Sequence, residues 1–454
     1  MDIEILNKYN QEHLLKFFDK LSQEQKDKLT NDINKVDFEL LKKLITIYKD
    51  SGKPKKNIIP EPDDVYQPKK HSFAELNQIK SIGNETLQRG EVCFFVVAGG
   101  QGSRLGYDKP KGEFPISPIK NKSLFQIHSE KIKAINDYYK TNMPFIIMTS
   151  EVNNDDTIKF FENNNFFGLN KNDIFFIKQG VLPAIDFDGK IILKDKDSIF
   201  FSPDGHGGSL KTLNTNVTDI LLDRGIKILS YFQVDNPLVH IADPLFIGLH
   251  VKSKSQMSNK VLKKRDPLEK VGVVCKINGK NSIIEYSDLD DKYAFQKDNS
   301  GELVYGFGSI AIHLFDLEFI KTFENDIELP YHIAKKSIQQ LNSLGEIIKP
   351  ENPNGIKFEQ FVFDALPFAK KTLNFETFRE IDFAPLKNKS GEDSIDTCKQ
   401  SQIELFKLWL KQASINYNDS IKLEISPTFA FSEDIFLEKK DQIKNDFSKD
   451  CYLD

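Results

Sequence analysis

Glycines and cations gather in one short run of this 454-residue chain, Val96 to Lys111, with the sequence VVAGGQGSRLGYDKPK. The apolar residues Val92 to Val97, which overlap the start of this run, predict a buried strand that ends where the glycines begin. Without side chains, the backbone N–H groups of Gly99, Gly100 and Gly102 can approach a phosphate or a base edge, and an adjacent helix start would favour an anion. Arg104 and Lys111 add positive charge. The run therefore has the chemistry of a nucleotide-binding loop.

Two familiar phosphate-binding loops have a different spacing. The dinucleotide fingerprint is G-x-G-x-x-G, and the P-loop is G-x-x-x-x-G-K-[ST], in which the lysine directly follows the second glycine. Here Arg104 stands inside the loop and Lys111 closes it. A nicotinamide-dependent enzyme would also need an acidic ribose ligand about 20 residues further on. Taken alone, the glycine cluster still allows the alternative of a tight turn with two solvated cations.

The spacing in GQGSRLGYDKPK resembles the G-x-G-[ST]-R-(several)-P-K signature of sugar-1-phosphate nucleotidyltransferases. Further blocks, in order along most of the chain, resemble the eukaryotic-type UDP-N-acetylglucosamine pyrophosphorylases, in the UDPGP family of sugar-1-phosphate uridylyltransferases. These blocks include QEHLLKFF, MTSE, LPAIDFDGKIIL, SPDGHGGSL, VDNPLVHIADPLFIG, VGVVCKINGK, IIEYSD, PNGIKFEQFVFD and FAPLKN.

The resemblance implies a uridylyltransferase that makes UDP-N-acetylglucosamine and pyrophosphate from UTP and N-acetylglucosamine 1-phosphate. In that reaction a sugar phosphate oxygen attacks the α-phosphorus, so the protein must align the reacting groups and stabilise spreading negative charge. By resemblance Arg104 and Lys111 are the catalytic pair, and Lys387 in APLKN contacts the sugar phosphate. An arginine can clamp the triphosphate with two hydrogen bonds, and a lysine supplies a compact charge near the α-phosphate.

Asp235 lies in QVDNP, directly after the apolar run ILSYFQV. A carboxylate at the end of a strand can hold Mg²⁺ (or Mn²⁺) against phosphate oxygens, and this is the role that the resemblance implies. The alternative is an Asx-turn that caps the strand together with Asn236 and Pro237. A hard cation keeps several waters, so one protein carboxylate is enough to hold it beside a nucleotide.

The uracil ring needs donors and acceptors matched to its imide edge. Backbone groups of Ala98 and Gly99, together with the side chain of Gln179, fit that need. The match for Gln179 rests on the block KQGVLPAIDFDGK, and the alternative is a surface turn residue. By resemblance Gly205 in PDGHGG offers backbone close to the nucleotide, and Lys357 in NGIKFE contacts its phosphate.

The residues expected on the sugar side depart from the family pattern. Glu285 in IIEYSD matches a glutamate that accepts hydrogen bonds from sugar hydroxyls, with a strand-edge charge as the alternative. His206 stands where the family has asparagine, Phe307 replaces a small residue and Ser309 replaces another asparagine. Serine reaches less far than asparagine, and phenylalanine fills volume. A UDP-glucose or broad UDP-sugar pyrophosphorylase, using a sugar without the acetamido arm, therefore stays open as an alternative.

A catalytically silent sensor of sugar nucleotides is a third reading. Such a protein would be expected to lose the cations that clamp phosphates, yet all the charged candidates are present. They are Arg104, Lys111, Asp235, Lys357 and Lys387. An enzyme is therefore the favoured interpretation.

Composition limits the partners and the compartment. The 62 Lys and Arg against 67 Asp and Glu give a net charge of -5, which argues against a general nucleic-acid surface. The 4 cysteines form no C-x-x-C pair, which favours a reducing compartment. The chain begins without a signal-like segment and has no apolar run of about 18 residues, so we expect a cytoplasmic protein that does not enter a membrane. We expect a monomer or a weak homo-oligomer whose ligands are UTP and a sugar 1-phosphate.

The order of elements predicts an α/β protein. Strand-like runs alternate with helical segments from about residue 75 to 390, and the resemblance implies a Rossmann-like (GT-A-like) nucleotidyltransferase domain with a mixed sheet there. Residues 1–60 are predicted to form a small helical region, with Ser22 and Gln25 as a capping box. Residues 391–454 are predicted to form a small C-terminal module around a helix at 400–412. The predicted strands are 93–97, 145–148, 174–177, 228–234 and 271–277.

Overall fold

The computed structural model describes residues 3–51, 58–323, 327–342 and 344–454. The chain packs into two compact units, each built from several segments. Unit 1 consists of Met1–Ile58, Gln179–Leu210 and Glu328–Asp364. Unit 2 consists of Ile59–Lys178, Lys211–Ile327 and Ala365–Asp454. The sequence instead predicted three consecutive segments, and packing alone does not test that division.

Unit 2 is organised on a 9-stranded mixed sheet, as the sequence predicted. The main order is β12-β11-β13-β9-β1-β2-β3, and β10 pairs with both β13 and β18. Strands β9, β1, β2 and β3 run parallel to one another, whereas β13 is antiparallel to β9. The bounds are β1 Val92–Val97, β2 Phe145–Thr149, β3 Ile174–Lys178, β9 Ile228–Gln233, β10 Met257–Lys263, β11 Gly272–Ile277, β12 Lys280–Ile284, β13 Phe307–Asp316 and β18 Thr372–Glu376. All five predicted strands are therefore present.

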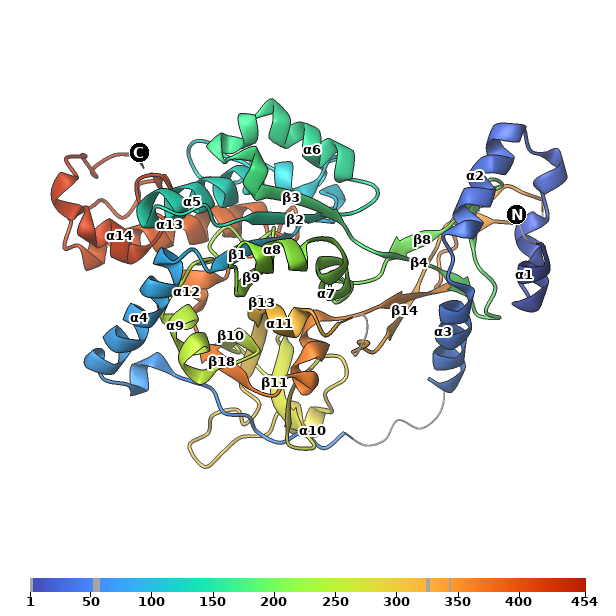
Figure 1. Ribbon diagram of the computed structural model, residues 1–454. Coiled ribbons are helices and arrows are strands. Elements are labelled where there is room, and N and C mark those ends of the chain that lie inside the picture. The colour runs from blue at the N-terminus through green and yellow to red at the C-terminus, as the bar shows by residue number, and fades with distance from the viewer. Residues whose placement is uncertain (1–2, 52–57, 324–326, 343) are drawn as a thin grey trace. The chain divides into compact units, whose positions relative to one another are not determined.

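Helices pack around this sheet, and Figure 1 shows α5, α13 and α14 close together beside its parallel part. The apolar core of the sheet continues into the C-terminal segment through residues such as Trp409 and Leu410, so that segment shares the core of unit 2. The helices of unit 2 are α4 Phe73–Gln88, α5 Leu124–Tyr139, α6 Asn154–Asn163, α8 Asp219–Asp223, α9 Pro244–Ser253, α10 Asp291–Ala294, α11 Leu317–Ile320, α12 Arg379–Asp382, α13 Ile395–Gln412 and α14 Glu433–Glu438. A pair of parallel strands, β19 Leu423–Ile425 and β20 Cys451–Leu453, completes it.

Unit 1 combines N-terminal helices with short strands from later in the chain. The predicted capping box is present, because Ser22 accepts from the Gln25 N–H and the Gln25 side chain accepts from the Ser22 N–H. The helices are α1 Ile3–Lys8, α2 Gln23–Asn34 and α3 Phe38–Asp50, and helix α7 Gly208–Leu213 starts in this unit. The strands are β4 Val181–Pro183, β5 Ile185–Asp186, β6 Leu193–Asp195, β7 Ser198–Ile199, β8 Phe201–Pro203, β14 His332–Lys336, β15 Gln340–Leu341, β16 Ile347–Ile348 and β17 Gly355–Glu359. Their apolar faces form a core separate from that of unit 2.

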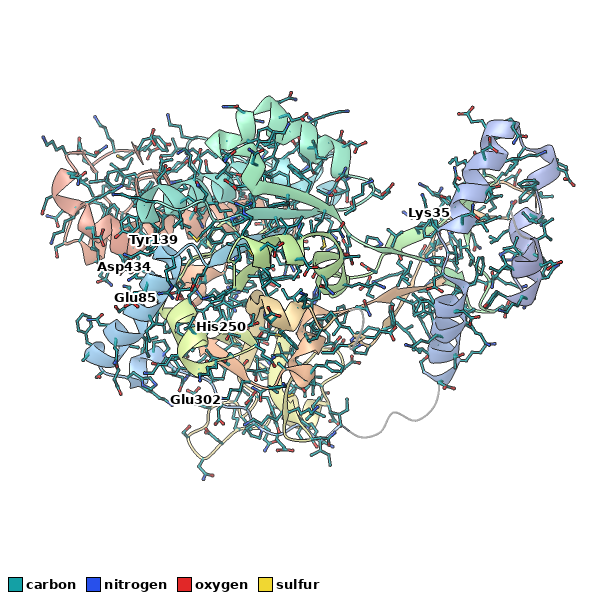
Figure 2. All side chains as sticks on the ribbon, in the orientation of Figure 1. Lys35, Glu85, Tyr139, His250, Glu302 and Asp434 are labelled. Carbon is teal, nitrogen blue, oxygen red and sulfur yellow. The ribbon has the colours of Figure 1, made fainter. Side chains whose placement is uncertain are left out.

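Helices α4 and α9 cross in direct backbone contact. A Cβ at Gly83 would lie 1.8 Å from the Pro244 carbonyl oxygen, and one at Gly248 would lie 1.9 Å from the Ile79 carbonyl oxygen. Helix α9 is fixed to the sheet by His250, labelled in Figure 2, whose Nδ1 lies 2.7 Å from Ser258 Oγ on β10. Among the described residues, no helix is long and apolar enough to cross a membrane.

Replacement of Gly83 by alanine is expected to destabilise unit 2. The added methyl group meets backbone rather than a mobile side chain, and overpacking of this kind typically costs about 1–3 kcal/mol. Thermal unfolding of Gly83→Ala, compared with Ser81→Ala on the exposed side of the same helix, measures the effect. Equal melting temperatures for the two variants would show that the helices can move apart without loss of stability.

Candidate functional site

The glycine loop and the segment with Asp235 leave the sheet side by side. Strands β1 and β9 are parallel, and their last paired residues are Val97 and Gln233. The Val234 N–H donates to the Val97 carbonyl oxygen at 3.1 Å, which continues the contact beyond the strands. Because parallel strands end at the same edge, the loop after β1 and Asp235 after β9 emerge together, as the sequence predicted.

Ala98 is held on both sides of its backbone. Its N–H donates to the Met148 carbonyl oxygen at 2.8 Å, and its carbonyl oxygen accepts from Asn153 Nδ2 at 2.9 Å. A carbonyl oxygen has two lone pairs, so that atom can still accept one hydrogen bond from a ligand. Asn153 was missed in the sequence, where only its position shortly after β2 distinguished it.

The glycines of the loop divide into two kinds. Gly102 donates its N–H to the Lys109 carbonyl oxygen at 3.0 Å, and a Cβ there would lie 2.9 Å from the Tyr107 carbonyl oxygen. A Cβ on Gly100 would meet nothing within 4 Å. Among the described residues, the backbone hydrogen bonds include none donated by Gly99 or Gly100, so these two N–H groups are available to a ligand.

One expectation about this loop is wrong. The glycines were expected to lead into a helix whose first turn would favour an anion. A single 3-10 turn, Ser103–Leu105, follows instead, and Gly106 ends it in the left-handed region at φ 72°. Such a short turn has no appreciable macrodipole, so attraction for phosphate must come from the free N–H groups and the nearby cations.

Lys111 and Asp235 form an ion pair at the edge of the sheet. Lys111 Nζ lies 3.1 Å from Asp235 Oδ2, and the two side chains are 17% and 18% exposed. The Lys111 N–H also donates to the Gly100 carbonyl oxygen at 3.0 Å, which ties the lysine to the glycine part of the loop. The predicted catalytic cation and the predicted metal carboxylate are thus in direct contact, largely buried yet accessible to a ligand.

The other two predicted catalytic cations lie at the surface of unit 2. Arg104 is exposed within the 3-10 turn. Lys387 is 45% exposed, and its Nζ lies 3.6 Å from Asp393 Oδ2. The Leu386 N–H donates to the Asp235 carbonyl oxygen at 2.8 Å, so the residue before Lys387 is anchored beside the ion pair. Long exposed side chains of this kind can reorient toward a phosphate.

The register of the strands gives the positions of three of the predicted sugar-side residues. Ser309 pairs with Gly272, and Phe307 lies two residues earlier on the same face of β13. One residue beyond the pair Val273 and Ile284, the same register places Glu285 opposite Gly272. Ser309 and Glu285 are thus two strands, about 10 Å, apart on one face, with a glycine between them. On this strip of sheet the space over Gly272 is occupied, because a Cβ there would lie 2.6 Å from Ile283 Cγ2.

In unit 1, Gln179 and Gly205 are in contact. Gln179 Nε2 donates to the Gly205 carbonyl oxygen at 2.8 Å, which leaves its own carbonyl oxygen to accept from a ligand. Gly205 has φ 87°, and a Cβ there would lie 2.4 Å from the Gln360 carbonyl oxygen. Only glycine satisfies both conditions, so the PDGHGG turn is shaped by its packing on the segment that follows β17.

His206 is a half-buried, neutral ring. Its Nδ1 accepts a hydrogen bond from the Val362 N–H at 3.1 Å, so the ring proton resides on Nε2. The ring stacks on Phe361 with centroids 5.4 Å apart. Burial, with a smaller contribution from the charge of nearby His332, lowers the pKa of His206 to about 4. His206 therefore offers a ligand a hydrogen-bond donor rather than a charge.

Lys357 lies within β17, beside the ring of Phe200. Its Nζ is 5.1 Å from the centre of the Phe200 ring. Burial lowers the pKa of this lysine from its ordinary value. A partly desolvated ammonium gains more from a phosphate than an exposed one does, because water competes less.

Asp235 remains the candidate metal ligand after the described side chains are compared. Among the described residues, no group of three or more His, Cys, Asp or Glu side chains could hold a metal ion, and all four cysteines are buried thiols. A single carboxylate fits Mg²⁺ only where phosphate oxygens and water complete the shell. Asp235 lies beside Lys111 and the loop with the free N–H groups, where a phosphate group could approach the carboxylate.

The sheet is mixed with parallel central strands, and a glycine loop that carries cations lies at the carboxyl ends of these strands. This combination defines a Rossmann-like nucleotidyltransferase. The family described as UTP–glucose-1-phosphate uridylyltransferase matches residues 41–446. The chain belongs to this family.

Relatives across eukaryotes carry more specific names. The chain is 36% identical over 448 residues to the UDP-N-acetylglucosamine pyrophosphorylase of Saccharomyces cerevisiae, covering 94% of this chain and 91% of that protein. It is 32% identical over 456 residues to UDP-N-acetylglucosamine diphosphorylase 2 of Arabidopsis thaliana, covering 95% and 89%. Its structure is similar to that of the Trypanosoma brucei uridine diphosphate N-acetylglucosamine pyrophosphorylase, with a TM-score of 0.84, 25% identity, and 100% and 97% of the two chains covered.

His206 is expected to stay neutral as the pH falls from 8 to 5, because protonation would put a charge into a partly desolvated ring whose Nδ1 already accepts a hydrogen bond. Its folded pKa lies below the unfolded value, so its contribution to stability is lost only as the pH falls below the ordinary value of about 6.5. Histidine NMR, with the signal assigned from a His206→Asn variant, follows the ring directly. A titration midpoint near 6.5 would contradict this assignment.

Proposed function

We propose that this protein transfers a uridylyl group from UTP to N-acetylglucosamine 1-phosphate, making UDP-N-acetylglucosamine and releasing pyrophosphate. The observation that carries the proposal is the Lys111–Asp235 pair beside free loop N–H groups, in a chain whose relatives are named for this reaction. Steady-state turnover with UTP, Mg²⁺ and a panel of sugar 1-phosphates tests it. Absence of pyrophosphate release with every sugar in the panel would overturn it.

The reaction needs alignment and charge stabilisation from the protein. A phosphate oxygen of the sugar 1-phosphate attacks the α-phosphorus, the bond from the α-phosphorus to the bridging oxygen breaks, and that oxygen leaves with pyrophosphate. Lys111 lies nearest the metal carboxylate, so we assign it to the α-phosphate, where negative charge accumulates. Arg104 is assigned to the pyrophosphate portion and Lys387 to the phosphate of the sugar. Both have the exposure and the reach to move onto an incoming anion.

Asp235 is assigned as the protein ligand of a divalent cation. Mg²⁺ held by Asp235 would neutralise part of the negative charge on the phosphates. Lys111 has three N–H donors, so it can keep its contact with Asp235 Oδ2 while donating to a phosphate oxygen. The carboxylate thereby orients the lysine as well as binding the metal.

Roles in nucleotide binding are also proposed for residues of unit 1, taken by itself. Gln179 keeps an amide carbonyl oxygen for the uracil imide N–H, and Gly205 brings the backbone of the PDGHGG turn close to the nucleotide. Lys357 is assigned to a nucleotide phosphate, consistent with its position on a partly dry aromatic surface. His206 contributes an uncharged Nε2–H donor to the substrate.

A non-acetylated sugar 1-phosphate, such as glucose 1-phosphate, is the second candidate acceptor. The specific observation that favours it is the strip of sheet around Gly272, where Phe307 adds bulk and Ser309 offers only a short hydroxyl. Glu285 at the other end of that strip can accept hydrogen bonds from the hydroxyls of either sugar. The identity of the relatives favours the acetylated sugar, and the residues of the strip determine how strongly it is preferred.

Removal of the Lys111 side chain is expected to lower kcat far more than it raises the KM for UTP, because its charge acts most strongly when the α-phosphate becomes more negative. Loss of one such electrostatic donor typically lowers the rate by about 100- to 1000-fold. Lys109→Ala removes an exposed lysine from the same loop and is the matched control. Comparable kcat values for Lys111→Ala and Lys109→Ala would remove Lys111 from the mechanism.

The double variant Phe307→Ala with Ser309→Asn is expected to raise the preference for N-acetylglucosamine 1-phosphate over glucose 1-phosphate. The acetamido group gains space and a partner, whereas glucose gains no contact. A change in pocket volume of this size alters discrimination by at most roughly 10- to 200-fold. The ratio of kcat/KM for the two sugars measures it, with Ile310→Val on the opposite face of β13 as control. An unchanged ratio would place this strip outside the acceptor site.

A further inference from the structure

The backbone from Val234 to Asp243 is held by side chains at successive points, although it lies outside any helix or strand. On one side stands helix α5. Its His128 Nε2 donates to the Val234 carbonyl oxygen at 3.0 Å, and Lys131 Nζ donates to the carbonyl oxygens of Pro237 at 2.6 Å and Val239 at 2.9 Å. A segment with this many fixed carbonyl groups is a rigid support for Asp235.

On the other side stands a buried ion cluster. Lys260 Nζ, on β10, lies 2.6 Å from Asp382 Oδ2 and 2.8 Å from Asp243 Oδ2, and the Lys260 and Asp382 side chains are only 1% and 2% exposed. Asp382 Oδ1 accepts from the His240 N–H at 2.8 Å, and Oδ2 also accepts from Thr377 Oγ1 at 2.6 Å. Asp382 Oδ1 thus contacts this segment directly, and Oδ2 is linked to its Asp243 through Lys260.

Asn236 connects the metal carboxylate's segment to the segment that carries Lys387. Its Nδ2 donates to the Asp382 carbonyl oxygen at 2.6 Å, and its Oδ1 accepts from the Ala384 N–H at 3.1 Å. Two residues further on, the Leu386 N–H donates to the Asp235 carbonyl oxygen at 2.8 Å. Three hydrogen bonds thus join residues 235–236 to residues 382–386.

We propose that Asn236, backed by the buried Lys260–Asp382 pair, is a positioning residue that fixes Asp235 and Lys387 relative to each other. This inference rests on the proposed roles of those two residues. The chemistry requires the nucleotide and the sugar phosphate to be held within about 0.5 Å of the productive geometry, and no single strand carries both groups. The Asn236 amide joins their two segments.

Asparagine is required here because one short side chain must both donate and accept. Alanine loses both hydrogen bonds. Aspartate keeps the shape and the acceptor for the Ala384 N–H, but it places a charged oxygen against the Asp382 carbonyl oxygen. A buried ion pair such as Lys260–Asp382 is weak evidence for stability, because desolvation offsets its attraction. The contacts of the Lys260–Asp382 pair indicate instead that it fixes the position of the segment from Val234 to Asp243.

The experiment compares Asn236→Ala and Asn236→Asp with the wild type, each also combined with Asp235→Asn. Measured quantities are kcat, the KM values, the Mg²⁺ concentration for half-maximal rate and the melting temperature. A misplacement of about 1 Å lowers rates by roughly 100-fold, so we expect kcat to fall on that order while the KM for UTP changes little. The Mg²⁺ requirement should rise, and both effects should shrink in the Asp235→Asn background, because residues acting as a unit are non-additive.

Ser230→Ala is the matched control. It removes another buried hydrogen bond to this segment, from Ser230 Oγ to the Ile241 carbonyl oxygen at 2.7 Å, but none of those that join the segment to residues 382–386. We expect it to lower the melting temperature without changing the Mg²⁺ requirement. Asn236→Asp carries the test if Asn236→Ala does not fold.

The outcomes are separable. If Asp235→Asn retains the wild-type rate and Mg²⁺ dependence, the proposed role of Asp235 fails and the inference falls with it. If Asp235→Asn loses activity but the Asn236 variants keep the wild-type Mg²⁺ requirement, or change it no more than Ser230→Ala does, the positioning role alone is overturned. Full additivity with Asp235→Asn overturns it equally.

Discussion

The contact between Lys111 and Asp235 is the interaction on which the proposed site in unit 2 depends. Each residue follows a different strand, and the two meet because β1 and β9 are parallel neighbours that end at the same edge. An ammonium and a carboxylate held 3.1 Å apart, largely buried, place two opposite charges at that edge where water screens them less than at the surface. The sheet, the glycine turn and the supports behind both residues serve to maintain that geometry.

Local charge explains how an acidic protein can bind anions. The net charge of -5 gives no general attraction for a polyphosphate. Free N–H groups at Gly99 and Gly100, together with Lys111 and Arg104, concentrate positive potential where strands end. Much of the surrounding acidity is already paired, as Asp382 with Lys260 and Asp393 with Lys387 illustrate. Affinity for a nucleotide thus follows from placement rather than from total charge.

The two units, each described by itself, carry different kinds of polar groups. Unit 2 holds the cations and the carboxylate assigned to the reaction, fixed by a large sheet. Unit 1 holds neutral or partly desolvated groups. Its PDGHGG turn packs on the segment after β17 through Gly205 and His206. Such groups suit recognition of a base and a sugar, because hydrogen bonds to neutral partners discriminate shape more than charge.

The sequence by itself determined the elements and the class of chemistry. Apolar runs ending in glycine or aspartate predicted the strands and the residues at their ends, since periodicity and turn chemistry are local properties. It also gave Ser22 and Gln25 as a capping box. Only the tertiary structure decided which polar side chains support those ends. Asn153, Asn236, Lys260 and Asp382 act through contacts between residues far apart in sequence, so no spacing could have identified them. The expected helix after the glycines is absent for a local reason, because Gly106 ends the single 3-10 turn in the left-handed region.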